Sequence, residues 1–378
     1  MQVAAWPSAL GHRLIVWLRW LCVSWLFLAG SAFAQGSTDP AVQRGVAWLQ
    51  GQIHASGQLA SEGTSPALPM QIRSETAITL RAVAQTIPPA LYTAIEGVTP
   101  DTTEYLARKA IGKQLAAGSD AAHLDALIKL QNADGGFGAA AGLASNPQDT
   151  AWALRALAAG QANSAAAVKA LGWLVSAQQA DGQWKLVPDG DAVVTTALAV
   201  QTLTLYRQQP AIRAVLTKVR TWLMDQRNAS QRWGDDLRTA HALLAVLPGL
   251  TSASTMQAAV DGLRQSQMAD GSWAADGYLT ALALRALWLA VQPTTNPDLV
   301  SLTGQVVNEA GQPIAGAAVR LTGAGQQATT GADGRFAFTQ LVAGQDQLDI
   351  QATGYRPMLT QLSLQPGQQL DLGVIRMS

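Results

Sequence analysis

The chain has 378 residues, of which 48% are hydrophobic and 13% are charged, and its formal net charge at pH 7 is zero. Such a composition is typical of folded chains with a large core, and the length favours about two domains. Because the sequence has neither a basic excess nor an acidic tail, it excludes the usual charge pattern of a nucleic-acid-binding protein.

The first 34 residues have the pattern of a secretory signal. They contain no Asp or Glu, two arginines precede an apolar run over residues 21–33, and small residues occupy positions 32 and 34. We therefore predict an exported protein, periplasmic or secreted, with cleavage between Ala34 and Gln35. The alternative is a membrane anchor, but the run is short for a bilayer span, which needs about 20 residues. We expect membrane contact only through this segment before cleavage.

Cleavage would remove the single cysteine of the chain, Cys22. The mature chain would then have no thiol, no disulfide and no cysteine ligand for a metal. Two arginines and no acidic residues would leave with the segment, so the net charge would become −2.

Three short segments share the pattern Gln-X-X-Asp-Gly-X-aromatic, over residues 131–137, 178–184 and 267–273. A degenerate fourth copy over residues 226–233 is one residue longer and lacks the Asp-Gly pair. An earlier turn around residues 57–59 has lost the aromatic residue. The spacing of roughly 40 to 50 residues is typical of a repeat architecture.

Each copy follows one apolar segment with helical spacing and precedes another that opens with a Thr-Ala pair. The glycine is suited to end the first helix because it tolerates the left-handed conformation. The helices after the Thr-Ala pairs are apolar nearly all round, whereas the other helices carry Lys, Arg and Gln on one face. We therefore predict about five helix pairs that form a ring of inner helices inside outer helices.

This pattern resembles the terpenoid cyclase and protein prenyltransferase superfamily, whose Gln-to-Trp repeats build an α/α toroid, over residues 41–291. The same toroid occurs in the thioester domain of the alpha-2-macroglobulin family, and residues 102–131 are similar to bacterial members of that group. The resemblance implies an all-α toroid of helix-hairpin repeats over residues 35–291. Residues 86–103, which contain Pro88, Pro89 and Pro100, are expected to form a long connection, either a binding surface or a tolerated insertion.

The composition changes after residue 291. A Pro-bounded polar linker is predicted over residues 292–298, followed by about seven short alternating segments separated by turn residues. This pattern predicts a small all-β sandwich over residues 299–378. Residues 304–307, 311–317 and 330–336 resemble the carboxypeptidase regulatory-like domain, a transthyretin-like sandwich without catalytic residues that accompanies secreted and surface proteins.

Squalene-type cyclases protonate an alkene with the central Asp of an Asp-X-Asp-Asp-Thr-Ala motif. The matching stretch here has Asn146 in the first position and Gln148 in the position of the proton donor. An amide is not a strong general acid, which argues against cyclisation. Asp149 matches the last Asp of the motif and is a weak catalytic candidate, with helix capping as its ordinary explanation.

Metal and thioester chemistry lack their ligands in this sequence. Without cysteine, the mature chain has neither the zinc site of the prenyltransferases nor the Cys-Gly-Glu-Gln stretch of the thioester proteins. The histidines at positions 54, 123 and 241 show no ligand spacing, so we predict no metal and no cofactor. His241 lies on a predicted inner helix and is either a ligand-binding residue of the ring cavity or a packed core residue.

Several polar and aromatic residues are candidates for ligand binding. The loops that lead to inner helices carry four carboxylates, Asp189, Asp191, Asp235 and Asp236. These either gather on one rim and bind a cation or polar ligand, or they lie in separate loops and caps. Trp152 is the main aromatic candidate for the cavity. The tryptophans of the turns are expected to be structural wedges between helices.

Taken together, the intact structural motifs and the missing catalytic ones favour a non-catalytic binding or surface-assembly protein of a bacterial envelope. Its expected partner is an envelope or extracellular protein or a glycan. The alternative is a divergent enzyme that acts on an isoprenoid, lipid or polysaccharide in the toroid cavity. Aromatic residues around that cavity would favour a cyclase, because carbocations are stabilised over aromatic faces. The fold alone does not establish an activity.

Overall fold

The computed structural model describes residues 38–99, 101–118, 120–186, 190–250, 253–292, 300–323, 325–341, 344–365 and 368–378. These residues form two compact units, one of helices that ends at Gln292 and one of β-strands. The predicted signal segment, the predicted linker after Gln292 and the candidate Asp189 lie outside the described residues. Among the residues described, no helix has both the length and the apolar character to cross a membrane.

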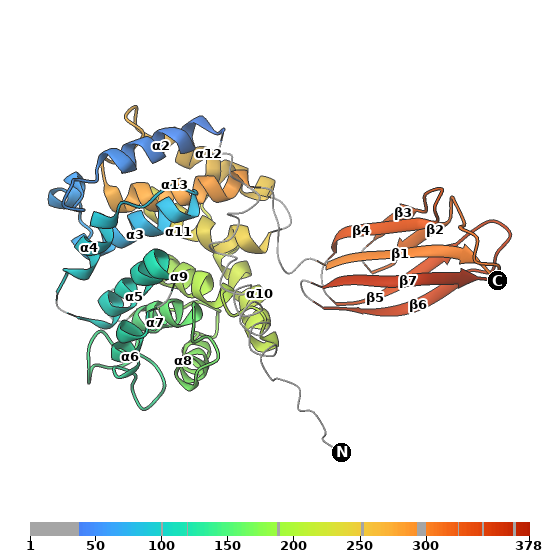
Figure 1. The fold of residues 1–378 in the computed structure, drawn as a ribbon, viewed down its shortest axis with the longest axis horizontal. Helices are drawn as coiled ribbons and strands as arrows, with labels where there is room; N and C mark the ends of the chain where they lie inside the picture. The colour runs from blue at the N-terminus through green and yellow to red at the C-terminus, as the bar shows by residue number, and fades with distance from the viewer. Residues whose placement is uncertain are drawn as a thin grey trace, which may run out of the picture. The chain divides into compact units, whose positions relative to one another are not determined.

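The helical unit is a closed ring of helix pairs (Figure 1). The outer helices are α2 (Pro40–Gly51), α4 (Pro89–Glu96), α6 (Ala122–Ile128), α8 (Ala165–Ser176), α10 (Pro210–Asp225) and α12 (Gln257–Ser266). The inner helices are α3 (Pro69–Ala82), α5 (Thr103–Ala117), α7 (Pro147–Ala158), α9 (Ala192–Thr204), α11 (Asp236–Val246) and α13 (Gly277–Val291). Short 3₁₀ turns are η1 (Ala60–Gly63), η2 (Leu247–Gly249) and η3 (Ala253–Met256). Each inner helix packs against the next, which confirms the predicted toroid.

The ring closes between its two ends, because α13 packs against both α2 and α3. The hydroxyl of Thr79 in α3 donates to the carbonyl oxygen of Ala281 in α13 at 2.9 Å. On the outside, Arg264 of α12 forms a 2.9 Å ion pair with Asp39, the N-cap of α2. Contacts between segments more than 200 residues apart thus complete the ring.

The structure contains one helix pair more than the five predicted, counted over the described residues. Residues 86–103, predicted as a long connection, contain the outer helix α4, so that prediction is wrong. The prolines suggested a break, but Pro89 occupies the first turn of α4, where a missing N–H costs nothing. Leu91 and Ile95 of α4 are buried and pack the helix into the ring.

The repeated turns share one hairpin. In the last turn the N–H of Met268 donates to the carbonyl of Ser272 at 2.8 Å, and the N–H of Gly271 donates to Met268 at 3.0 Å. The same two hydrogen bonds occur in the turns over residues 54–58, 132–136, 179–183 and 228–232. The prediction that the fourth copy is one residue longer than the others is therefore wrong, because its hairpin has the same length and the copy begins at Arg227. Its Gln231, at φ +59°, takes the place that glycine has elsewhere, such as Gly271 at +96°.

The tryptophans of the turns are structural wedges, as predicted. Trp184, Trp233 and Trp273 are buried, and each indole N–H donates to a carbonyl of the preceding outer helix. In three turns the Thr of the Thr-Ala pair holds the backbone of the aromatic residue, as Thr280 does by accepting from the N–H of Trp273 at 3.0 Å. The hydroxyls of Thr76 and Thr239 have no such partner among the described residues. The repeated residues thus fasten three of the turns to the start of an inner helix.

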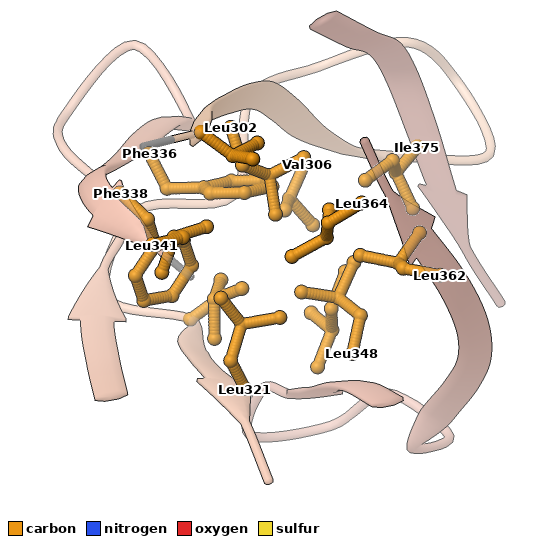
Figure 2. Packing of buried hydrophobic residues seen from close by; sticks show 14 of the residues in the cluster. Leu302, Val306, Leu321, Phe336, Phe338, Leu341, Leu348, Leu362, Leu364 and Ile375 are labelled. Carbon is orange, nitrogen blue, oxygen red and sulfur yellow. The ribbon is translucent and has the colours of Figure 1, made fainter. Parts of the chain in front are cut away.

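The second unit is a sandwich of seven strands in the described residues, as predicted. These are β1 (Val300–Asn308), β2 (Ala318–Leu321), β3 (Gln326–Thr329), β4 (Arg335–Leu341), β5 (Gly344–Gln351), β6 (Met358–Leu364) and β7 (Gln369–Met377). One sheet has the order β4-β1-β7, with β1 and β7 parallel, and the other has the order β3-β2-β5-β6. Figure 2 shows Leu302, Phe336 and Phe338 of the first sheet packed against Leu321 and Leu348 of the second.

Candidate functional site

The inner helices carry a connected series of polar and aromatic side chains that pass from helix to helix around the ring. Each of the six inner helices contributes at least one of them within the described residues. The series consists of Glu75 on α3, Arg108 on α5, Trp152 and Arg155 on α7, Gln201 on α9, His241 on α11, and Tyr278 and Arg285 on α13. We call this set the ring cluster.

Glu75 is the anionic centre of the ring cluster. Its carboxylate lies 2.9 Å from a guanidinium nitrogen of Arg285 and 3.3 Å from one of Arg108. Burial would raise the pKa of Glu75, but the charges of Arg285 and Arg108 outweigh burial and lower it to about 2. Glu75 is therefore ionised at neutral pH and joins α3 to both of its neighbours in the ring.

Arg108 is the most thoroughly paired cation of the cluster. Besides Glu75, it forms a 2.8 Å ion pair with Glu104 one turn earlier on α5, and it donates to the hydroxyl of Ser74 at 2.7 Å. Its guanidinium carbon lies 3.7 Å from the centre of the Trp152 ring. One face of the only aromatic cavity candidate predicted from the sequence thus carries a cation.

Arg155 has a different environment. Its guanidinium lies 4.6 Å from the centre of the Trp152 ring and donates to Gln201 Oε1 at 3.4 Å. No carboxylate among the described residues lies within ion-pair distance of it. The pKa of Arg155 is lowered to about 10, chiefly by burial and also by the charges of Arg285 and Arg108, against the opposing influence of Glu75. Its side chain remains partly exposed, so solvent reaches this part of the ring.

His241 and Tyr278 complete the cluster on the other side of the ring. Their ring centroids are 6.4 Å apart. His241 is 5% exposed, and its Nδ1 has no hydrogen-bond partner among the described residues. Burial lowers the pKa of His241 to about 4 and raises that of Tyr278 to about 12, so both side chains are neutral at pH 7.

Asp149 lies in the first turn of α7, and the cap of that helix is Asn146 rather than Asp149. The Asn146 side chain accepts from the N–H of Asp149 at 2.9 Å and donates to its carboxylate at 2.6 Å. Burial raises the pKa of Asp149 to about 6, although the hydrogen bond from Asn146 opposes this shift. Asp149 precedes Trp152 and Arg155 by one and two helical turns, so these side chains share one face of α7.

The other candidate carboxylates gather only in part. Asp191 and Asp235 are the N-caps of α9 and α11, and Arg238 bridges them at 2.5 and 2.7 Å. Asp236 forms an ion pair with Arg232. Because these acids already have cationic partners, they offer little to a further cation. The described part of the chain contains no group of three His, Cys, Asp or Glu side chains placed to hold a metal.

Sequence reasoning named Trp152 and His241 but missed Glu75, Arg108, Arg155 and Arg285. A signal for two of them was present, because the sequence Ala-Leu-Arg-Ala-Leu occurs at residues 153–157 and again at residues 283–287. In both copies the arginine follows the Thr of the Thr-Ala pair by five residues, and Gln201 has the same position after Thr196. The position alone is not sufficient, because Arg81 also follows Thr76 by five residues and is exposed.

Comparison with known families finds a match for the C-terminal unit. Residues 301–378 match the model of the carboxypeptidase regulatory-like domain. The sandwich is a member of that family. The family match and the seven strands together confirm the prediction made from the turn motifs, and this unit is called the regulatory-like domain below.

Solved structures with the same helical fold include an ent-copalyl diphosphate synthase from Streptomyces platensis, at 18% identity and a TM-score of 0.50. That match covers 59% of this chain and 50% of the synthase, so this chain spans about half the length of the synthase. The type II terpene cyclase MstE from Scytonema matches at 15% identity and a TM-score of 0.37 over 65% of this chain and 96% of the cyclase. Haptocorrin in complex with Cbi matches at 12% identity and 0.44 over 91% and 99%.

The likeness to the synthase shows that the helical unit has the terpene cyclase-like toroid fold, as predicted. At 18% identity this match supports the fold and not an activity. No curated protein matches the chain.

Proposed function

We propose that the protein is an exported, non-catalytic binding protein in which the interior of the helical ring holds the ligand. The observation that carries this proposal is the ring cluster, to which all six inner helices contribute polar or aromatic side chains. A ring that served only as a scaffold would be expected to fill its interior with apolar side chains, because buried polar groups stabilise less than packed apolar ones. The regulatory-like domain is the accessory module, directed toward an envelope or extracellular protein or a glycan.

The chemistry of the interior disfavours cyclisation. A cyclase needs a strong acid and aromatic faces that stabilise a carbocation. Here the proton-donor position is Gln148, and the Trp152 ring lies against the guanidinium groups of Arg108 and Arg155. Three arginines in one interior would repel a carbocation, whereas they suit a ligand that is polar or negatively charged.

The test is native mass spectrometry of the full chain purified from its own envelope fraction under mild conditions. We expect a small molecule or glycan to co-purify with the protein and to be released unchanged on unfolding. Fractionation of the same cells tests export, with the protein expected in the periplasm or medium and shortened by its first 34 residues. Recovery of a chemically converted ligand would overturn the proposal that the protein is non-catalytic. Recovery of the protein in the cytoplasm would overturn the proposal that it is exported.

A second candidate function is a divergent enzyme of the ring interior, and one observation favours it. Asp149 is buried with a pKa raised to about 6, which is the range of a useful general acid at neutral pH. Incubation with isoprenoid, lipid and polysaccharide extracts tests this candidate. Turnover that is lost in Asp149→Asn and kept in Asp235→Asn, a change at the partly exposed cap of α11, would favour the enzyme over the binding protein.

A further inference from the structure

The ring cluster contains more positive than negative charge where its side chains meet. Arg108 and Arg285 share Glu75, and Arg108 also has Glu104 as a partner. Arg155 is the third guanidinium and has no carboxylate at ion-pair distance among the described residues. The nearest acid on its own helix is Asp149, six residues and about 9 Å along the helix axis away. Arg155 is therefore the guanidinium of the cluster without a carboxylate at ion-pair distance among the described residues, and Glu75 acts on it only from farther away.

The guanidinium of Arg155 is also held in place with donors to spare. A guanidinium has five N–H donors, and the hydrogen bond seen for Arg155 among the described residues goes to Gln201 Oε1. Gln201 is itself fixed, because its amide nitrogen donates to the carbonyl oxygen of His241 at 3.1 Å. The Trp152 ring supports the flat side of the group at 4.6 Å. Such a planar cation with free parallel N–H groups matches the two oxygens of a carboxylate or phosphate.

A second feature of the same region points to a ligand. His241 is buried, and its Nδ1 lacks a hydrogen-bond partner among the described residues, although buried polar atoms in proteins are rarely left without one. Gln201 accepts from Arg155 and donates to the backbone carbonyl of His241, and the charge of Arg155 acts on the His241 imidazole, so the two residues belong to the same part of the cluster. One polar ligand could satisfy both.

We infer that the ring interior binds an oxyanion, a carboxylate or phosphate group of a larger ligand, with Arg155 as its principal contact. Gln201 positions the guanidinium, and His241 offers an additional polar contact. This inference rests on the proposed binding function and specifies the chemical class of the ligand. An oxyanion would supply the negative charge that Arg155 lacks, whereas a metal ion or an organic cation would add to the repulsion among the three arginines.

Calorimetric titration of the full chain with inorganic phosphate and with acetate, at low chloride concentration, tests the inference. We expect saturable binding of at least one of the two, weakened at least tenfold in Arg155→Gln. The matched control is Arg264→Gln, because Arg264 is an arginine on the outer helix α12 with two carboxylate partners. Binding of phosphate alone identifies a phosphate ligand, and binding of acetate alone identifies a carboxylate. Absence of binding to both, or equal binding by Arg155→Gln and the parent, would overturn the inference.

Two further measurements separate ligand binding from a structural role. Thermal unfolding of Arg155→Gln should occur at or near the parent temperature, because the change removes a partly buried charge that has no carboxylate at ion-pair distance among the described residues. Labelling of the parent with phenylglyoxal, read by mass spectrometry, should modify Arg155 and should be blocked by the anion that binds. This labelling requires no variant, so the inference can fail even if Arg155→Gln does not fold. Labelling of Arg155 that is unaffected by phosphate and acetate would contradict it.

The inference and the proposed function can fail separately. If native mass spectrometry finds an uncharged ligand whose binding depends on Trp152 but not on Arg155, the proposed binding function holds and the inference of an oxyanion ligand is wrong. If anions bind but no ligand is retained from the envelope, the chemistry of the site holds and the proposed biological role falls.

Discussion

The turns of the toroid and the interior of its ring use polar groups in opposite ways. In the turns, most of the repeated residues pair with one another or with the adjoining helices, as the Gln267 amide does with the carbonyls of Ala41 and Gly271, although the hydroxyls of Thr76 and Thr239 have no partner among the described residues. In the interior, Arg155 and His241 leave hydrogen-bonding groups without partners among the described residues. The repeated residues of the turns thus serve the fold, whereas the inner faces of the helices, including the repeated Arg155 and Arg285, are the place to look for function.

The first prediction concerns Glu75, whose carboxylate forms ion pairs with both Arg285 and Arg108 in the ring interior. Glu75→Gln should lower the free energy of unfolding by about 3–5 kcal/mol, because it leaves the buried charge of Arg285 without a partner. Urea unfolding of the full chain measures this. The control is Asp261→Asn, which removes a partly exposed partner of Arg264 and should cost less than about 1 kcal/mol. Equal costs for the two variants would show that the ion pairs of the interior contribute no more than surface pairs.

The second prediction concerns His241, whose buried Nδ1 has no hydrogen-bond partner among the described residues. The pKa of its imidazole is lowered from 6.5 to about 4, so the folded protein binds its proton less readily than the unfolded chain. The stability that the neutral form provides is present above pH 6.5 and is lost as the pH falls toward 4, by up to about 3 kcal/mol. Below about pH 4.5, Glu75 adds a separate loss.

Comparison of the parent with His241→Gln between pH 7 and 4 isolates this contribution, since the variant has no imidazole to protonate. The subtraction matters because Asp149, with a raised pKa, changes stability in the opposite direction over pH 6 to 4. Unfolding curves of the two proteins that shift equally with pH would show that His241 is not buried as a neutral group.

The third and smallest prediction concerns the last turn. Gln267 donates to Gly271 within its own turn and to Ala41 of α2, and its oxygen accepts an exposed hydrogen bond from Arg44, whereas the bond described for the Gln178 amide goes to Gly182 within its turn. Gln267→Leu should cost about 2 kcal/mol and Gln178→Leu about 1 kcal/mol, because each lost partly buried hydrogen bond contributes roughly 1 kcal/mol and the exposed bond to Arg44 contributes little. Thermal unfolding of the two variants measures the difference. A larger loss of stability for Gln178→Leu than for Gln267→Leu would mean that the hydrogen bond from Gln267 to Ala41 does not support ring closure.

The sequence predicted the toroid because the turns need particular residues. A positive φ favours glycine, and a buried wedge needs a large aromatic ring, so Gly271 and Trp273 reveal their turn without any tertiary information. The pair that contains α4 was missed because the connection from α4 to α5 has no aromatic residue, and its one glycine, Gly97, has a negative φ of −73°. The contacts that hold α4, which are the buried Leu91 and Ile95 and a hydrogen bond from Arg73 to the carbonyl of Ala94, have no repeated sequence pattern.

The ring cluster could not be predicted in the same way. Its central ion pair joins Glu75 to Arg285, which are 210 positions apart in the chain and meet because α13 packs against α3. A single charge in an apolar helix does not disclose whether it will be paired. Trp152 and His241 were named because an aromatic ring and an imidazole have recognisable chemistry on their own, whereas the importance of Arg155 depends on what its neighbours lack.

Closure of the ring has a consequence for how this protein can diverge. An open repeat array can gain or lose units at its ends, because each unit touches only its neighbours. In this molecule α13 returns to α2 and α3, so an added or deleted pair would separate Thr79 from Ala281 and open the interior to solvent. The number of units is therefore fixed by geometry, and a change in ligand preference has to come from substitutions on the inner faces of the six helices rather than from duplication.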